Sequence, residues 1–200
     1  MELASDALVI THGAGGNCEM PLLVAVAESF AASGVTVLRC NLPFRQKRVS
    51  GPPHAGSAAV DRAGLKQAVS AMRAMVPGRV FLGGQSYGGR QASLLAAEDR
   101  DAAHGLLLLS YPLHPPGKPG QLRTSHFPSL RIPSVFVQGS SDPFGSFEEI
   151  QAALKLIPAP AVLVEIGNAG HDLARGKFDI ASLVVKPFLR LMQDSRVTPL

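Results

Sequence analysis

The chain has 200 residues, 46% of them hydrophobic and 17% charged, which is enough to bury a sizeable core in a single domain over residues 1–200. Its formal net charge of +4 is mildly basic and does not by itself indicate a nucleic-acid partner. No apolar run approaches the ~18 residues that span a bilayer, and residues 1–6 lack the pattern of a signal peptide. We therefore expect a cytoplasmic protein with no membrane, nucleic-acid, metal or cofactor requirement.

The two cysteines, Cys18 and Cys40, form no metal-binding or redox motif. Cytosolic thiols are mostly reduced, so we expect both to be free. Both should lie near one sheet edge, and a disulfide between them stays open as an alternative. Cys18 is expected to be a buried, inert thiol rather than a second nucleophile.

Apolar runs of strand length alternate with amphipathic segments of helix length. Strands are predicted at residues 7–11, 35–40, 79–83, 105–110, 135–138 and 162–166. Helices are predicted at residues 21–32, 60–75, 147–156 and 180–192, with a further one after Ser86. The strand runs are continuously apolar, which is typical of parallel strands covered on both faces. This alternation predicts an α/β fold whose chemistry lies at the carboxyl ends of the strands.

Two proline-containing segments, residues 41–57 and 111–133, interrupt the alternation. Proline removes a backbone donor and disfavours helix at the preceding residue, so both are predicted to be irregular loops. Both leave the sheet at its carboxyl edge, where they can wall a site. Neither is long enough to form a separate cap domain.

A Gly-x-Ser-x-Gly pentapeptide at residues 84–88 follows one predicted strand and precedes a helix. In that setting it is the pattern of a nucleophile elbow, a sharp turn that lifts the hydroxyl of Ser86 above the sheet edge. The flanking glycines are needed because a side chain would not fit between strand and helix. A structural serine in a tight turn is the simpler alternative.

A serine hydroxyl needs a base, and the base needs an acid that fixes its tautomer. Asp142 and His171 each follow a predicted strand, in the chain order serine, acid, histidine. Asp142 could instead cap the helix that begins near residue 147. Asp172 is a rival acid, although a neighbour of His171 rarely reaches that residue's own ring. The other histidines are expected to be structural or solvated, with His12 holding its own loop.

Two backbone N–H groups are expected to bind the oxyanion that develops during acyl transfer. One is that of Tyr87, the residue after the nucleophile. The other is placed at Ala14, in the glycine-rich loop of residues 11–17 after the first strand.

Four separated motifs together resemble the α/β-hydrolase superfamily over residues 7–192: residues 11–16, 84–90, 139–144 and 170–171. The Gly89-Arg90 pair and residues 111–119 resemble a small bacterial branch of it. That branch is related to dienelactone hydrolases and to the hydrolase-like subunit of the non-specific-lethal chromatin complex.

The resemblance implies a central parallel sheet flanked by helices. The sequence starts at the third of the superfamily's eight strands, so a minimal, six-stranded, all-parallel sheet is expected. No lid insertion is present, which implies a shallow, open cleft for small or extended acyl substrates.

These observations predict a serine hydrolase that cleaves a carboxylic ester or thioester through an acyl-enzyme intermediate. A non-catalytic interaction module with the same fold is the alternative from another class. Acyl transfer or amide hydrolysis by the same triad is a third reading, and the oligomeric state is left open.

Basic residues gather in the two proline-containing segments, including Arg45, Lys47 and Arg48 in the first. Such residues are most often solvated, but Arg90, Lys118 and Arg123 could together receive a substrate carboxylate or phosphate. Arginine suits planar, bidentate recognition of such groups. We therefore expect a small acyl substrate, which could carry a negative charge, and an acidic partner docked on the basic loops is the alternative if the chain is an interaction module.

Overall fold

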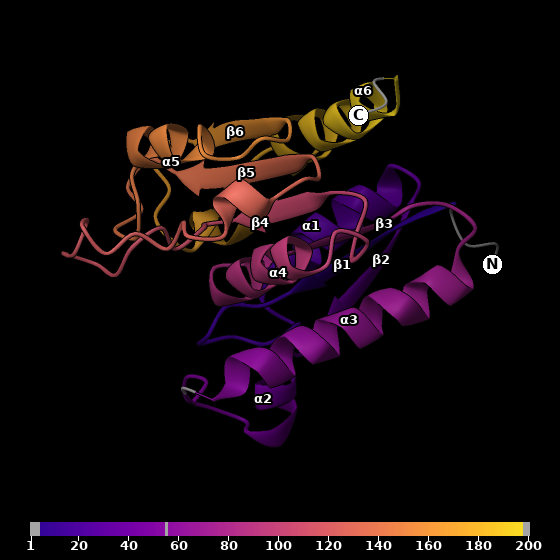
Figure 1. Cartoon of the computed structure of the whole chain (residues 1–200), viewed down its shortest axis with the longest axis horizontal. Helices are drawn as coiled ribbons and strands as arrows, with labels where there is room; N and C mark the ends of the chain where they lie inside the picture. The colour runs from indigo at the N-terminus through magenta and orange to yellow at the C-terminus, as the bar shows by residue number, and fades with distance from the viewer. Residues whose placement is uncertain (1–4, 55, 198–200) are drawn as a thin grey trace.

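The computed structural model describes residues 5–54 and 56–197, and its centre is a parallel sheet (Figure 1). Six strands lie in the order β2-β1-β3-β4-β5-β6. They are β1 (Asp6–Thr11), β2 (Val35–Cys40), β3 (Val80–Gln85), β4 (Leu106–Leu109), β5 (Ser134–Gly139) and β6 (Ala161–Ile166). The six-stranded, all-parallel sheet is confirmed, and every strand lies within two residues of its predicted bounds. Residues 1–4, which include most of the segment without a signal-peptide pattern, lie outside the described residues.

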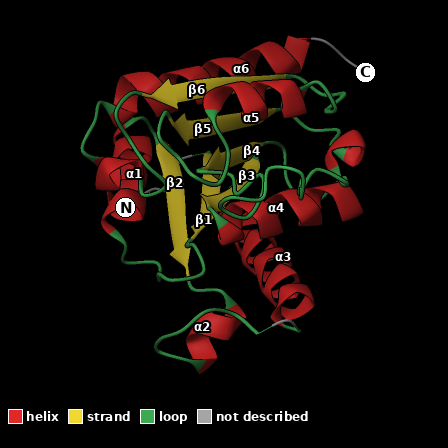
Figure 2. Ribbon diagram, turned by 90° about the vertical axis from the view of Figure 1, so that its left-hand side faces the viewer, coloured by secondary structure: helices red, strands yellow, loops and turns green. Residues whose placement is uncertain are grey.

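Helices cover both faces of the sheet (Figure 2). They are α1 (Pro21–Ala32), α2 (Pro43–Lys47), α3 (Ser57–Met75), α4 (Tyr87–Glu98), α5 (Phe147–Leu154) and α6 (Lys186–Val197). Side chains of α1 and α6 pack on one face, where the rings of Phe30 and Phe188 meet with centroids 5.4 Å apart. Side chains of α3, α4 and α5, such as Leu65, Leu95 and Ile150, form the core on the other face.

The four inner strands, β1, β3, β4 and β5, are almost entirely buried, which explains their apolar runs, whereas the edge strands β2 and β6 are partly exposed. All four leucines of β4 are fully buried. The register places Thr11 at the end of β1 opposite Cys40 of β2 and Gly84 of β3, so the carboxyl ends meet at one edge. In Figure 1, α2 and the loop of residues 111–133 lie at the end toward which the strands point.

Short segments account for most differences from the sequence-based elements. The segment 41–57, predicted to be irregular, contains α2, and Pro43 opens this helix at its first position, where no N–H is needed. The segment 111–133 is irregular apart from the single turn η1 (Phe127–Ser129). The last predicted helix begins as a π-helical turn, η3 (Ala181–Val185), before α6.

Helix α5 ends at Leu154 rather than residue 156, and its start is fixed by a capping box of Ser146 and Glu149. Asp142 therefore does not cap this helix, and that alternative is wrong. Both cysteines are free thiols, half-buried rather than fully buried. Burial raises the pKa of Cys40 to about 11. No helix among the described residues is both long and apolar enough to cross a bilayer.

Candidate active site

Ser86 stands at the sharp turn between β3 and α4. Its φ of 50° and ψ of −116° form a strained conformation for a residue with a side chain. Two glycines let the neighbouring segments come this close. A Cβ atom at Gly88 would lie 2.4 Å from the carbonyl oxygen of His12, and one at Gly84 would lie 2.7 Å from the amide nitrogen of Gly89. The steric requirement inferred from the pentapeptide is therefore met by the fold.

The strand order places Ser86 beside a crevice in the sheet edge. The chain runs from β1 outward to β2 and then returns to form β3 on the other side of β1. Loops that leave the carboxyl ends of strands at such a switch point diverge and leave room for a ligand. Asp142 and His171 reach the same edge from the loops after β5 and β6.

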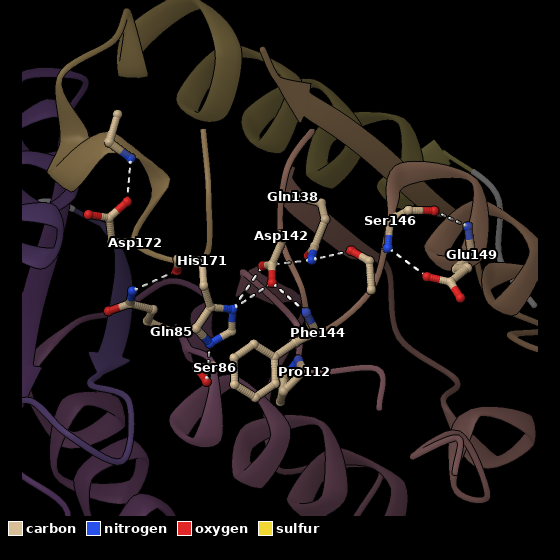
Figure 3. Close-up of polar contacts among 12 residues, drawn as sticks. Gln85, Ser86, Pro112, Gln138, Asp142, Phe144, Ser146, Glu149, His171 and Asp172 are labelled. Carbon is tan, nitrogen blue, oxygen red and sulfur yellow. Dashed lines mark hydrogen bonds and ion pairs between the residues drawn. The ribbon is translucent and has the colours of Figure 1, made fainter. Parts of the chain in front are cut away.

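Ser86, His171 and Asp142 form a hydrogen-bonded row (Figure 3). His171 Nε2 lies 2.8 Å from Ser86 Oγ. His171 Nδ1 lies 2.8 Å and 3.0 Å from the two carboxylate oxygens of Asp142. The Asp142 side chain is fully buried, whereas that of His171 is 24% exposed. A buried acceptor at Nδ1 favours the tautomer whose Nε2 lone pair faces the serine hydroxyl.

The carboxylate of Asp142 is itself held in place. It accepts hydrogen bonds from the N–H of Phe144 and from Nε2 of Gln138, both at 2.9 Å. The Phe144 ring stacks on the imidazole of His171, with centroids 4.1 Å apart. Asp172, the rival acid, instead accepts from the N–H of Ala174. The acid in the row is therefore Asp142.

The loop after β1 lies against Ser86 and presents Ala14. A Cβ atom at Gly13 would lie 3.4 Å from the Cβ of Ser86. The carbonyl of Gly13 accepts from Nδ1 of His12 at 2.8 Å and from the N–H of Gly16 at 3.2 Å. Because the peptide bond is trans, the N–H of Ala14 points opposite to that anchored carbonyl.

Tyr87 is the first residue of α4, so its N–H has no partner within the helix. Its side chain is fixed elsewhere, since the hydroxyl donates to Asp61 at 2.8 Å. Burial, followed by this hydrogen bond, raises the pKa of Tyr87. The other oxygen of Asp61 accepts from the N–H of Phe44 at the start of α2, which links α2, α3 and α4.

Arg45 of α2 is buried and holds the loop after β1 from behind. Its guanidinium donates to the carbonyl oxygens of Gly16 at 2.7 Å and of Ala14 at 2.9 Å. It also donates to the carbonyls of Arg48 at 3.1 Å and of Gly51 at 2.9 Å. Four acceptors from two loops thus surround one cation. Arg45 is neither solvated nor available to a substrate, contrary to the expectation for this basic segment.

His12 fastens the same loop to the segment after β2. Its Nε2 accepts from the N–H of Leu42 at 3.1 Å, while Nδ1–H donates to Gly13. This pair of bonds requires a neutral ring. The pKa of His12 is lowered, chiefly by burial of the ring, which agrees with the neutral form. The expectation that His12 holds its own loop is confirmed.

Comparisons with known proteins agree with this architecture. A family described as an alpha/beta hydrolase domain matches residues 4–183. The chain belongs to the α/β-hydrolase family.

Solved structures with the same fold include Est1E from Butyrivibrio proteoclasticus with ferulic acid bound, with a TM-score of 0.76, 20% identity, and coverage of 99% of this chain and 92% of that one. A dienelactone hydrolase from Anabaena variabilis has a TM-score of 0.73 and 19% identity over 96% and 87% of the two chains. An α/β serine hydrolase without a lid from Xanthomonas campestris has a TM-score of 0.72 and 18% identity over 94% and 83%. The predicted relation to the chromatin-complex subunit stays a prediction.

The cleft of this α/β hydrolase opens directly beside the row. It has a volume of about 300 Å³. Its lining consists of Gly13, Ala14, Gly15, Gly16, Met20, Gln85, Ser86, Phe144 and His171. A second hollow of about 250 Å³ shares Met20 and Gln85 with it and extends to Asp172 and Arg175. Hollows of about 410 and 440 Å³ lie elsewhere, beside α6 and α5, and contain none of the three residues of the row.

The three predicted substrate contacts separate into a pair and an outlier. Arg90 on α4 and Arg123 on the loop after β4 are half-buried and near each other, whereas Lys118 is exposed. Among the described residues, no three His, Cys, Asp or Glu side chains gather in a way that could hold a metal ion.

Sequence reasoning did not assign functions to Gln138, Phe144, Arg45 or Asp61. Phe144 stands two residues after Asp142 and could have been noticed as part of the 139–144 motif. Gln138, a polar residue inside an otherwise apolar strand, was the other available signal. Nothing in the sequence distinguishes Arg45 from its basic neighbours.

Proposed function

We propose that this α/β hydrolase is a serine hydrolase that cleaves a carboxylic ester or thioester through an acyl-enzyme intermediate. The observation that carries the proposal is the hydrogen-bonded row of Ser86, His171 and Asp142. Within it, the imidazole of His171 lies within 3.0 Å of Ser86 Oγ on one side and of the buried Asp142 carboxylate on the other. A base that bonds both its acid and its nucleophile is the arrangement that nucleophilic catalysis requires.

In the first half-reaction, Ser86 Oγ forms a bond to the carbonyl carbon while its proton passes to Nε2 of His171. The carbonyl oxygen becomes an oxyanion that the N–H groups of Ala14 and Tyr87 receive. The bond to the leaving oxygen or sulfur then breaks, and Nε2 returns the proton to that atom. The Asp142 carboxylate stabilises the imidazolium throughout.

In the second half-reaction, a water molecule gives a proton to Nε2 and bonds to the acyl carbon. Collapse of that intermediate breaks the bond to Ser86 Oγ, which recovers the proton from His171. The free acid leaves and the starting state is restored. A cleft of about 300 Å³ without a cap domain supports a substrate whose acyl part is small or extended.

Labelling with a fluorophosphonate probe, followed by peptide mass spectrometry, tests the nucleophile directly. We expect one adduct, on Ser86, and a burst of para-nitrophenol from para-nitrophenyl butyrate. Ser86→Ala should abolish both and lower turnover by roughly 10⁴-fold or more. Ser33→Ala, which removes a serine at the end of α1, is the matched control and should label normally.

A Ser86→Ala variant with normal turnover would overturn the assignment, and an intact protein without an adduct would favour the interaction module. Partition of the acyl group between water and added methanol separates hydrolysis from acyl transfer. An anilide analogue of the ester measures amide cleavage in the same way.

A further inference from the structure

Two arginines lie on the β4 side of Ser86, away from the loop after β1. We call Arg90 and Arg123 the arginine pair. The strand order fixes the side, because β3, which leads into Ser86, lies between β1 and β4, and Arg123 belongs to the loop after β4. Arg90 lies one helical turn after the serine, and its N–H donates to the carbonyl of Ser86 at 2.9 Å.

Hydrogen bonds of the surrounding side chains hold the arginine pair in place. The Tyr111 hydroxyl donates to the carbonyl of Arg123 at 2.7 Å. The Ser93 hydroxyl donates to the carbonyl of Arg90 at 2.9 Å and lies 2.8 Å from Nε2 of His126. These residues come from α4, the end of β4 and the following loop, so the pair is built by several elements rather than by one exposed segment.

The positive charge of the pair has no acid to balance it. Neither guanidinium has a carboxylate within 4.0 Å in the described part of the chain, although eight other ion pairs are present there. The Nε of Arg90 is shielded from solvent and has no acceptor. Buried donors are nearly always bonded, so this Nε is a donor that an anionic ligand or a water molecule can satisfy.

The neighbours of the pair add no negative charge. Burial, together with Arg90, lowers the pKa of His126 to about 4, so this ring is neutral at neutral pH. Burial, followed by Arg90, also lowers the pKa of Arg123. Arg123 lies near His114, which contacts Glu149 at 3.2 Å, but the carboxylate of Glu149 is occupied by His114 and the N–H of Ser146.

The pair borders the reacting atoms through the start of the same loop. Nη1 of Arg123 donates to the carbonyl of Pro112 at 3.3 Å. Two residues later, the N–H of His114 donates to the carbonyl of Phe144, whose ring stacks on His171. These contacts link the loop that carries Arg123 to the Phe144 ring beside His171, on the β4 side of the cleft.

We propose that Arg90 and Arg123 form a subsite for an anionic group, a carboxylate or a phosphate, that the ester substrate carries. The proposal rests on the proposed function and names its substrate class. Planar guanidinium groups bind such oxyanions with two hydrogen bonds each, and the half-buried position strengthens those bonds. Lys118, which the sequence grouped with the arginines, is not part of this subsite.

Two ester pairs of equal length test the subsite. One pair places the charge on the acyl side, para-nitrophenyl hydrogen adipate against its neutral methyl ester. The other places it on the leaving group, meta-acetoxybenzoate against methyl meta-acetoxybenzoate. In whichever pair places its charge at the subsite, we expect kcat/KM to be about 10- to 100-fold higher for the anionic ester than for the neutral one. This is the gain expected from charge-assisted hydrogen bonds.

Arg90→Gln and Arg123→Gln should each lower the ratio of anionic to neutral kcat/KM by about tenfold or more. Lys118→Gln removes an exposed charge from the same loop and is the matched control, so its ratio should equal that of the wild type. The proposal is overturned if the wild-type ratio is near one for both ester pairs. It is also overturned if Lys118→Gln lowers the ratio as much as the arginine variants do.

A binding measurement keeps this test separate from catalysis. Saturation-transfer NMR on the Ser86→Ala protein compares benzoate and phenyl phosphate with neutral benzamide. Binding of either anion that is lost in the Arg90→Gln/Arg123→Gln background supports the subsite, and the stronger anion identifies the carboxylate or phosphate class. Equal signals from all three ligands in both backgrounds would reject it, whether or not the wild-type protein hydrolyses esters.

Discussion

The loops on the two sides of Ser86 use arginine in different ways. On the β1 side, Arg45 donates to four backbone carbonyls within 3.1 Å, and two of them belong to the loop that carries Ala14. On the β4 side, Arg90 keeps a shielded Nε without an acceptor. The comparison separates a cation that serves as a framework element, Arg45, from one that we propose binds a ligand, Arg90. The hydrogen-bond partners, rather than the residue type, distinguish these uses.

Removal of Arg45 should have the largest effect on this contrast. Arg45→Met leaves the carbonyls of Ala14 and Gly16 unanchored, so the loop that presents the N–H of Ala14 is held less firmly. We expect kcat to fall by about 100-fold, at the lower end of the loss seen when an oxyanion donor is removed, with KM nearly constant. Neutral and anionic esters should lose rate equally.

Arg48→Met is the matched control for this variant, because Arg48 is an exposed arginine just beyond α2. Circular dichroism and a thermal melt should establish that the Arg45→Met protein is folded. A rate loss confined to anionic esters would contradict the framework role and would make Arg45 resemble Arg90.

The double variant Arg45→Met/Arg90→Gln sharpens the comparison further. If the two sides act separately, the activation free-energy changes that the single variants cause in kcat/KM for the anionic ester should add within about 0.5 kcal/mol. The anionic-to-neutral ratio should depend on Arg90 alone. A ratio that changes with Arg45 would mean that the two sides share one binding surface.

The tyrosines on the two sides should differ in their contribution to stability. Tyr87→Phe removes a donor from the fully buried carboxylate of Asp61, and we expect it to lower the free energy of unfolding by about 2 kcal/mol. Tyr111→Phe removes a donor from a neutral carbonyl of Arg123 and should cost about 1 kcal/mol. Urea unfolding measures both, and the reverse order would contradict the charge argument.

The histidines give the smallest effect, and it depends on pH. Burial lowers the pKa of both His12 and His126 below the ordinary value of 6.5, to about 4 for His126. The folded state therefore favours the neutral rings. Their contribution to stability is complete above pH 6.5 and is lost as the pH falls from there toward 4. His126→Gln should flatten the unfolding free energy over this window, and an unchanged slope would count against it.

The arrangement of strands was predictable because each strand is a continuous apolar run bounded by turn residues. Ser86, Asp142 and His171 could be selected because each lies in the loop or turn that follows such a run, and parallel strands bring those positions to one edge. The short helix α2 was missed because Pro43 reads as a helix breaker, although it suits the first helical position.

The contacts around these three residues could not be predicted from the sequence and became visible only in the folded structure. The acceptors of Arg45 come from residues 14–16 and 48–51, and only the folded chain brings these segments together. The same holds for the arginine pair, where sequence alone included Lys118 and left out His126. Side chains that bond backbone groups of other loops leave no periodic pattern for sequence reasoning to detect.

No segment of the described chain forms a cap over the cleft at Ser86, and the cleft is walled by the loops that leave the sheet. Enzymes with moving lids often spend part of each cycle on opening and closing. If the proposed esterase activity holds, we expect the substrate to reach Ser86 without a lid-opening step, so gating should not limit turnover. Progress curves should start without a lag, and added viscogen should affect kcat only through diffusion of the product.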